Sequence, residues 1–488
     1  MTRRVSRRMW IATGIGAGAA ALVARPVVHL AGAILRDGSG EAPLPAGTTD
    51  DASHLEQTRM GEIVRVAGDA EAVTAQVRGA LERAAERGWP VSIAGARHTM
   101  GGHTAAPGGL LLDMSGANHI AIDGDLLRAG SGARWHDVIR ALDARGRAVE
   151  VMQSNADFSI GGSLGANCHG WQPGRAPIAS TVESFTMVLA GGQVARCSRS
   201  ENAELFRHAI GGYGLFGVMT EVSLRTTANQ LVTSERSVLG LEELGPALVA
   251  LGDAELAFGR LSIETGSLRF EETLLTAYRG TGERPPPLVD PPRDDLARAL
   301  FRGEVGSDYG KELRWRAERW LGGEGGERAS RNQLMLEPVA RFGNRRRDQT
   351  DILFEGFVPP AALAAYARTV RRIVARHEAD LLNVTVRHVL EDRDTVLRYA
   401  AREVLGLVML FSQPRSRAAD ERTRAMTRAM IDAALDHGGR YYLPYRPHAT
   451  RGQLRRTYPE AEGWAALKRA SDPSSRFRNR FWDRYFRS

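Results

Sequence analysis

The chain has 488 residues, which is too long for one ordinary hydrophobic core and predicts two folded domains. Its hydrophobic content of 43% and charged content of 25% are those of a globular protein. The formal charge of +8 is concentrated at the ends, because four arginines lie within residues 3–8 and a net five positive charges lie within residues 468–487. The remainder sums to about −1, which excludes the basic face that a nucleic-acid-binding domain needs.

The N-terminal segment has the pattern of a targeting sequence. Arg7-Arg8 precedes an uncharged run from Met9 to Ala24, and Ala31-Gly32-Ala33 offers a small-residue cleavage site. The paired arginines predict the twin-arginine export route, with a signal over residues 1–34 and a polar linker over residues 35–54. The alternative is a retained membrane anchor, although the run is shorter than the about 20 residues of a typical spanning helix. We expect an exported, periplasmic or extracellular protein.

The first half of the body alternates strands and helices. Residues 71–88 carry apolar side chains at helical spacing, and the apolar runs at 63–66 and 91–94 predict a strand on each side of that helix. The elements expected next are a strand at 110–113, a helix at 135–146, strands at 184–190 and 193–199, a helix at 204–210 and a strand at 218–224. Gly191-Gly192 suits a two-residue hairpin between two of these strands.

The character of the chain changes after about Thr227. The spacing predicts strands at 351–358, 382–388 and 405–411 and helices at 360–377 and 418–436. The proline-rich segment 283–293 and the glycine-rich segment 322–331 are interpreted as surface excursions, on either side of the helix-prone segment 294–321. This mixture predicts a second α+β layer domain.

Three glycine-rich loops occur in the first half, each at the end of a strand or a helix. They are Gly95 to His103, Ser159 to Gly170 and Gly211 to Gly217. Glycine lets backbone N–H groups approach phosphate oxygens and adopts positive φ without strain. Together the loops favour a ligand with phosphates and flat rings.

The ordered set of motifs resembles the FAD-binding domain of the vanillyl-alcohol oxidase (p-cresol methylhydroxylase) family. Gly95-Ala96-Arg97-His98-Thr99 is similar to the pyrophosphate loop of its sugar-alcohol and aldonolactone oxidases, and Gly108 to Asp113 to the strand that follows. The second glycine loop resembles the family's loop beneath the flavin, and the third resembles the family's glycine-rich signature. Near the C-terminus, Asp472 to Asn479 is similar to the family's closing D-P-x-x-x-F-x-N motif.

The resemblance implies an α+β fold in which a two-subdomain FAD-binding domain of the p-cresol methylhydroxylase type carries a cap with a mainly antiparallel sheet. The expected boundaries are 55–228 for the FAD-binding domain, 229–450 for the cap and 451–488 for a segment that returns to the first domain. It also implies FAD as cofactor. The residues expected to hold FAD are Gly95, Ala96, Arg97, His98, Thr99, Met100, Ser154, Ser159, Ile160, Gly161, Gly162, Ser163, Gly165, Asn167, His169, Gly170, Gly214, Gly217, Val218 and Asn479.

Attachment of the flavin is expected at His98, since related oxidases bond a histidine at this place covalently to the ring. The alternative is a histidine that only hydrogen-bonds. Residues 153–158 lack the cysteine that bicovalent relatives use, so a second bond is not expected. Cys168 and Cys197 are too few for a disulfide framework or a zinc site, and a single disulfide between them stays open. No metal site is expected.

The substrate side is expected on the cap. Arg387 lies where sugar-alcohol oxidases show a Glu-x-Arg pair on a strand that faces the flavin, but Thr385 replaces the glutamate. His448 lies in a run that resembles their R-P-H-W-G-K sequence only at its start. The resemblance predicts His448 as base or hydroxyl ligand and Arg387 as holder of an oxyanion or a carboxylate, with Tyr445 and Gln413 on the same wall. A solvated or merely paired role for either remains the alternative.

These features predict an FAD-dependent oxidoreductase that oxidises a CH–OH group of a sugar alcohol, an aldonolactone such as D-arabinono-1,4-lactone, or a hydroxy acid, with O2 or a quinone or cytochrome as acceptor. Association with a membrane through the N-terminus is a further expectation. A non-catalytic flavin-binding protein is the alternative. Gly161 to Gly165 also matches the G-x-S-x-G elbow of serine hydrolases, but the sequence after it is a poor helix former. A Rossmann nicotinamide site is disfavoured, because Gly212 to Gly217 precedes a strand instead of opening a helix.

Overall fold

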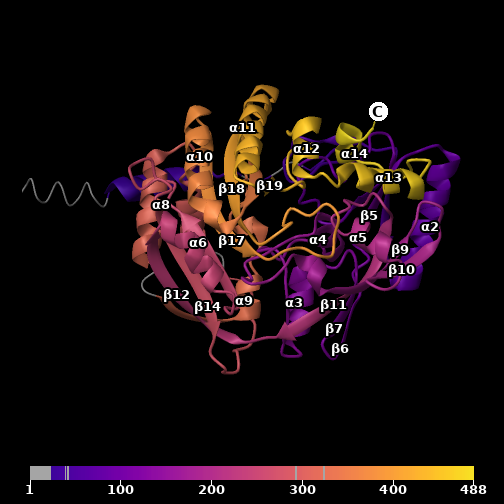
Figure 1. Cartoon of the computed structure of the whole chain (residues 1–488), viewed down its shortest axis with the longest axis horizontal. Helices are drawn as coiled ribbons and strands as arrows, with labels where there is room; N and C mark the ends of the chain where they lie inside the picture. Colours follow the sequence, from indigo (N-terminus) through magenta and orange to yellow (C-terminus); the bar gives the residue numbers. More distant parts are fainter. Residues whose placement is uncertain (1–23, 39, 41–42, 292–293, 322–324, 488) are drawn as a thin grey trace, which may run out of the picture.

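The computed structural model in Figure 1 describes residues 24–38, 40, 43–291, 294–321 and 325–487. Its elements form two regions, a first domain built mainly from residues before about 230 and a cap built from the residues after it. Mixed helices and largely antiparallel sheets confirm the predicted α+β class. Short elements outside the two main regions of sheet are β1 (Thr48–Thr49), β2 (Thr58–Arg59), η1 (Ile178–Thr181), η2 (Val339–Arg341), η3 (Pro360–Ala362) and a helix over residues 24–36.

The smaller sheet of the first domain is parallel, in the order β3-β5-β4. Its strands are β3 (Glu62–Ala67), β4 (Val91–Ala94) and β5 (Leu110–Gly116). Helix α2 (Ala70–Glu86) packs on it because Val73, Val77 and Leu81 share one buried face. Asp69 caps the helix by accepting a 2.9 Å hydrogen bond from the Ala72 amide. The predicted strand–helix–strand opening is confirmed.

The larger sheet of the first domain is antiparallel, in the order β10-β9-β11-β7-β6, with β8 paired to β11. Its strands are β6 (Ile120–Asp123), β7 (Leu126–Gly130), β8 (Arg147–Val149), β9 (Val182–Val188), β10 (Val194–Ser198) and β11 (Val218–Ala228). The helices of this region are α3 (Trp135–Asp143), α4 (Ile160–Ala166) and α5 (Ala203–Ala209).

Two local predictions in this region are wrong. The β9–β10 connection is a three-residue loop over residues 190–192, because Leu189 N donates to Gln193 O and Gly192 takes φ +81°. The second glycine loop contains a short helix, α4, which ends where Asn167 adopts the left-handed conformation. Within α4, Ser163 is buried and donates to Gln153 Oε1 at 2.7 Å, so it is not the exposed nucleophile that a serine hydrolase requires.

The cap is an eight-stranded antiparallel sheet in the order β15-β12-β14-β13-β17-β18-β16-β19. Its strands are β12 (Leu231–Gly240), β13 (Leu256–Leu261), β14 (Glu272–Gly280), β15 (Gly325–Ser330), β16 (Gln349–Val358), β17 (Asp380–Val389), β18 (Val404–Pro414) and β19 (Arg440–Tyr441). Its helices are α6 (Leu241–Ala250), α7 (Asp295–Arg302), α8 (Asp308–Leu321), α9 (Arg331–Met335), α10 (Leu363–Arg376) and α11 (Arg417–Asp436). Helices α6, α10 and α11 lie along the sheet (Figure 1). Strand β15 was not predicted, since its glycine-rich sequence suggested a surface loop.

The C-terminal segment packs against the first domain. It forms α12 (Arg451–Thr457), α13 (Ala461–Ser471) and α14 (Arg480–Tyr485). Between α13 and α14, Phe477 forms a parallel bridge with Val91 of β4 and is buried in the core beneath α2. Asp472 holds this turn, because its carboxylate accepts hydrogen bonds from the backbone amides of Arg476 and Phe477, each at 2.8 Å.

Candidate functional site

A cavity of about 1560 Å³ lies between loops of the first domain and the cap sheet. The first domain contributes residues of all three glycine-rich loops, including α4 in the second and Gly214 and Gly217 in the third, and the cap contributes side chains of β13, β16, β17 and β18. The predicted residues that line it are Gly95, Ala96, Arg97, His98, Thr99, Met100, Ser154, Ser159, Gly161, Gly162, Gly165, His169, Gly214, Gly217, Arg387 and Tyr445.

The first two glycine loops hold each other in place at this cavity. Ala96 N donates to Ser159 Oγ at 3.1 Å, and a side chain at Gly95 would stand 2.1 Å from the same oxygen. Glycine is therefore required for the loops to approach. Arg97 adopts φ +57° and its guanidinium pairs with Asp113 of β5 at 2.8 Å. The loop is thereby fixed to the parallel sheet.

The walls fit a dinucleotide with phosphates and a flat ring. The hydroxyls of Thr99 and Ser131 line the cavity, are buried and have no hydrogen-bonding partner among the described residues, so they are available as donors. At Gly165, in contrast, a side chain would meet nothing within 4 Å, because this face of α4 opens into the cavity. A phosphate needs polar donors such as these hydroxyls, and a flat ring beside it needs an open surface such as the glycine face of α4.

His98 lies in this wall with its ring stacked on Phe158, at a centroid distance of 4.1 Å. Burial, together with the nearby Arg134 cation, lowers the pKa of His98 to about 4. The imidazole is therefore neutral at physiological pH.

Six predicted cofactor or substrate residues of the first domain and the C-terminal segment are outside the lining. They are Ile160, Ser163, Asn167, Gly170, Val218 and Asn479. Asn167, for example, bonds Asp392 of the cap at 2.8 Å, and Asn479 caps α14 and donates to Tyr213 O at 2.9 Å. A side chain at Gly170 would stand 1.9 Å from Met152 O, so this glycine serves a close backbone approach.

The cap wall is organised by strand register. Arg260 of β13 is paired with Thr385 of β17, Thr385 with Val408 of β18, and Val408 with Glu355 of β16. All four side chains line the cavity, so they form one row across the sheet. Arg387 lies two residues beyond Thr385 and thus on the same face. Its guanidinium donates to Ser154 Oγ at 2.6 Å, which joins the cap to the first domain.

Glu355 is the most constrained side chain of this wall. Its carboxylate accepts hydrogen bonds from His169 Nε2, at 2.7 Å, and from the Tyr445 hydroxyl. Burial alone would raise the pKa of Glu355, but the His169 ring and the Arg387 guanidinium hold it below its ordinary value. Glu355 is therefore ionised at neutral pH within a buried site.

Glu355 was missed from the sequence, although a signal existed. The strand Ile352 to Val358 is apolar except for this one carboxylate, and a lone charge in a buried strand needs a partner. In the family's Glu-x-Arg pair the glutamate stands two residues before the arginine, where this chain has Thr385. The structure brings a glutamate to the same row from two strands away, at position 355.

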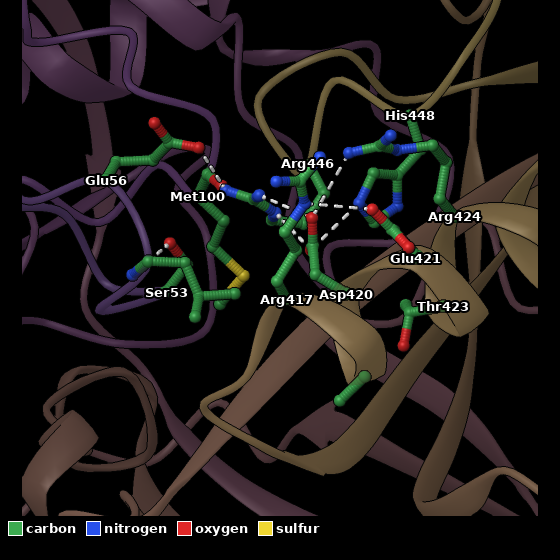
Figure 2. A network of polar contacts seen from close by, with 12 residues as sticks. Ser53, Glu56, Met100, Arg417, Asp420, Glu421, Thr423, Arg424, Arg446 and His448 are labelled. Atoms are coloured by element: carbon green, nitrogen blue, oxygen red, sulfur yellow. Dashed lines mark hydrogen bonds and ion pairs between the residues drawn. The ribbon is translucent and has the colours of Figure 1, made fainter.

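His448 and Gln413 do not line the cavity. Figure 2 shows His448 in a polar network with Asp420 of α11 and Arg446. His448 is 1% exposed, with Asp420 Oδ1 at 3.1 Å from one ring nitrogen and Thr427 Oγ1 at 3.2 Å from the other. Gln413 bonds Thr423 of the same helix. Since both ring nitrogens of His448 are engaged away from the cavity, the structure does not support its expected role as base.

The same network connects the first glycine-rich loop, Gly95 to His103, to the cap. Arg446 donates to Glu56 at 2.5 Å, to the Met100 carbonyl at 3.2 Å and to Asp420 at 3.1 Å (Figure 2). Met100 follows His98 closely in the first glycine loop. The network therefore positions the first glycine-rich loop, which carries His98, against α11.

Residues 71–198 match a family described as an FAD binding domain. The chain is 31% identical over 160 residues to an uncharacterized oxidoreductase, ORF5 of the fasciation locus of Rhodococcoides fascians, a match that covers 32% of this chain and 36% of that protein. It is 31% identical to cytokinin dehydrogenase 1 of Oryza sativa subsp. japonica over 28% of this chain and 27% of that one. It is 29% identical to D-arabinono-1,4-lactone oxidase of Yarrowia lipolytica over 23% and 22%, respectively.

The matched stretch thus spans only about a third or less of the length of these relatives. The family match, residues 71–198, includes the first two glycine loops, which contribute to the cavity. The cap lies outside the family match. The cofactor is FAD, and residues 71–198 carry an FAD-binding domain similar to that of FAD-linked oxidoreductases.

Proposed function

We propose that the protein oxidises a CH–OH group of a small polar substrate, such as a sugar alcohol, an aldonolactone or a hydroxy acid. The observation that carries the proposal is the buried, ionised Glu355 beside Arg387, on the cap wall of the cavity that takes FAD. Bound FAD supplies a hydride acceptor. The similarity to a protein named D-arabinono-1,4-lactone oxidase supports the same class of donor.

Each residue of the wall has a distinct task in this reaction. Glu355 accepts the proton of the substrate hydroxyl, while His169 and Tyr445 keep its carboxylate in place. Arg387 holds the substrate oxygen, for which its Nε is available, since this buried nitrogen has no hydrogen-bond partner among the described residues. Asn383 also lines the cavity, and its Oδ1, which likewise has no partner in the described part of the chain, accepts from further hydroxyls. Reoxidation by O2 or by a respiratory quinone or cytochrome completes the cycle.

The test of this arrangement is Arg387→Met, which keeps the length of the side chain and removes its charge. We expect the rate at which substrate reduces the bound flavin to fall about 100-fold or more, because the oxygen loses a charged hydrogen bond in a buried site. Flavin content should not change, since Arg387 belongs to the cap wall. Arg371→Met on α10, whose partner is Glu271, is the control. An unchanged reduction rate in the Arg387 variant would remove Arg387 from the site.

We also propose that His98 is the point of covalent attachment of the flavin. Its neutral, stacked ring at the cavity wall supports this role. After precipitation with acid, the parent protein should keep its yellow colour in the pellet, whereas His98→Ala should release flavin to the supernatant. His103→Ala is the matched control, because His103 lines the same cavity, and its flavin should stay in the pellet. Free flavin from the parent protein would contradict the covalent bond.

A further inference from the structure

The helix over residues 24–36 is firmly attached to the cap. His29 Nε2 contacts Gly303 O at 3.0 Å, and its ring packs edge-on against Tyr309 of α8 at 5.2 Å. Directly after the helix, Asp37 accepts two hydrogen bonds from Arg298 of α7, at 2.6 and 2.7 Å. Ala33 is only 4% exposed. The expected cleavage site at residues 31–33 therefore lies inside a helix that is packed on α7, which favours retention of this segment.

The outward face of this helix is apolar. Val27, Val28, Ile34 and Leu35 are all exposed, with Val28 at 71% and Leu35 at 87%. They are spaced by seven and eight residues, so they lie on one side of the helix. The polar side chain His29 instead points toward the cap. On a surface helix of a globular protein, apolar side chains usually face the core and polar side chains face water. An exposed apolar face of this kind marks an interaction site.

The charges around this face identify the partner. The first 36 residues contain six arginines and no aspartate or glutamate. Arg25 and Arg36, at the two ends of the described helix, are both exposed. The sequence before it, from Met9 to Ala24, carries no charge. Arg25 and Arg36 are the charged residues of this helix, and Arg25 also packs over the Tyr309 ring of α8 at 3.9 Å. An apolar stripe on a helix whose charged residues are both cationic matches the acyl region and anionic headgroups of a lipid bilayer.

Helices α7 and α8, which the helix over residues 24–36 contacts, also carry exposed apolar side chains, with Trp320 at the end of α8 opposite to Tyr309. Leu296 of α7 and Trp320 of α8 are exposed, and Trp320 is 83% exposed at the end of its helix. Tryptophan favours the interface between water and lipid. Figure 1 shows the helix over residues 24–36, in indigo, at the edge of the molecule beside α8. Among the described residues, none of the helices is long and apolar enough to cross a membrane.

We propose that the apolar face formed by Val27, Val28, Ile34 and Leu35 lies on an anionic lipid bilayer and holds the cap against it. Helix α7 then separates the bilayer from the cavity. Ala33 and Asp37 approach α7 from the lipid side. On its other side, Ala297, Leu300 and Phe301 line the cavity.

Local burial of the face is tested with Leu35→Cys in the full-length, FAD-loaded protein, labelled with a polarity-sensitive dye. Cys168 and Cys197 are buried, so the label goes to the new thiol. Vesicles of phosphatidylcholine and phosphatidylglycerol should shift the dye emission to the blue, and a lipid-borne quencher should reduce it. The control is Val194→Cys, at an exposed valine of β10, where neither change is expected. No shift at position 35 would overturn the proposal, even if the protein bound vesicles through its first residues.

The contribution of the face is tested with the double variant Val28→Glu and Leu35→Glu. Its affinity for the same vesicles should fall about tenfold or more, because two charged side chains replace apolar ones at the lipid interface. Val194→Glu should bind as the parent does. Flavin absorbance should be equal in all three proteins. A blue shift at position 35 that appears without vesicles and grows with protein concentration would instead identify a second copy of the chain as the partner and overturn the proposal.

Discussion

We expect Glu355→Gln to lower kcat by about 100- to 10,000-fold while FAD stays bound, because the variant keeps the shape of the side chain but cannot take a proton. The measurement is the rate at which an excess of substrate reduces the flavin, followed in the absence of oxygen. The amide oxygen can still accept from His169, and the amide NH2 group can donate to the hydroxyl oxygen of Tyr445, so the wall should keep its geometry. A loss smaller than about threefold would exclude Glu355 as the base.

The chain offers a matched control for this variant. Glu403 forms a similar pair with a buried histidine, His388, at 2.7 Å, but neither residue lines the cavity. Glu403→Gln should therefore leave kcat unchanged. Since the pKa of Glu355 is held below its ordinary value, kcat of the parent should not fall as the pH is lowered from about 8 to about 6. It should fall only at more acidic pH, where the carboxylate becomes protonated.

We expect Gly165→Leu to give a folded protein that contains less than about a tenth of the parent's FAD. Position 165 is in α4, where leucine is a better helix former than glycine, and the new side chain would meet no protein atom within 4 Å of its first carbon. It would instead fill space at the cavity wall that the cofactor needs. Flavin absorbance per protein and the thermal midpoint, both measured with added FAD, check the result.

The control for the glycine substitution is Gly463→Leu. Gly463 lies in α13, is exposed and likewise has nothing within 4 Å of an added side chain, but it is not part of the cavity. This variant should bind FAD as the parent does. In the His98→Ala background, where FAD is expected to bind without a covalent bond, the midpoint should rise with the concentration of free FAD, and adding Gly165→Leu should abolish that rise. Normal FAD content in Gly165→Leu would mean that the ligand does not approach α4.

The FAD side of the site could be predicted from the sequence because local chemistry determines it. A glycine is required wherever a backbone must come close or adopt positive φ, and such positions recur at fixed spacing within each loop. Gly95 and Gly214 are examples, the first through its approach to Ser159 and the second through φ +72°. The helical content of α4 was missed, since glycines at 161, 162 and 165 suggest a loop. Packing explains two of them instead, because a side chain at Gly161 would stand 2.8 Å from Ser131 and one at Gly162 would stand 2.9 Å from Ser159 Oγ, whereas Gly165 faces the cavity.

The substrate side could be predicted only in part, because tertiary register assembles it. Arg387 was found from its place on a strand, but its carboxylate partner comes from β16, which is separated from β17 by β18. No spacing rule relates positions 355 and 387 before the strand order is known. His448 was misplaced for the same reason, as its ring turns toward Asp420 of α11, about thirty residues earlier in the chain. The resemblance of residues 446–448 to the family's sequence run carries no information about where α11 lies.

The most direct test of the central claim is to mix the FAD-loaded protein, without oxygen, with a panel of sugar alcohols, aldonolactones, hydroxy acids and secondary amines. The loss of the flavin band near ~450 nm reports transfer of a hydride to the cofactor. The account predicts that at least one hydroxyl compound bleaches the band, and that Glu355→Gln slows the bleaching without loss of FAD. Bleaching by secondary amines alone would contradict the proposed CH–OH chemistry.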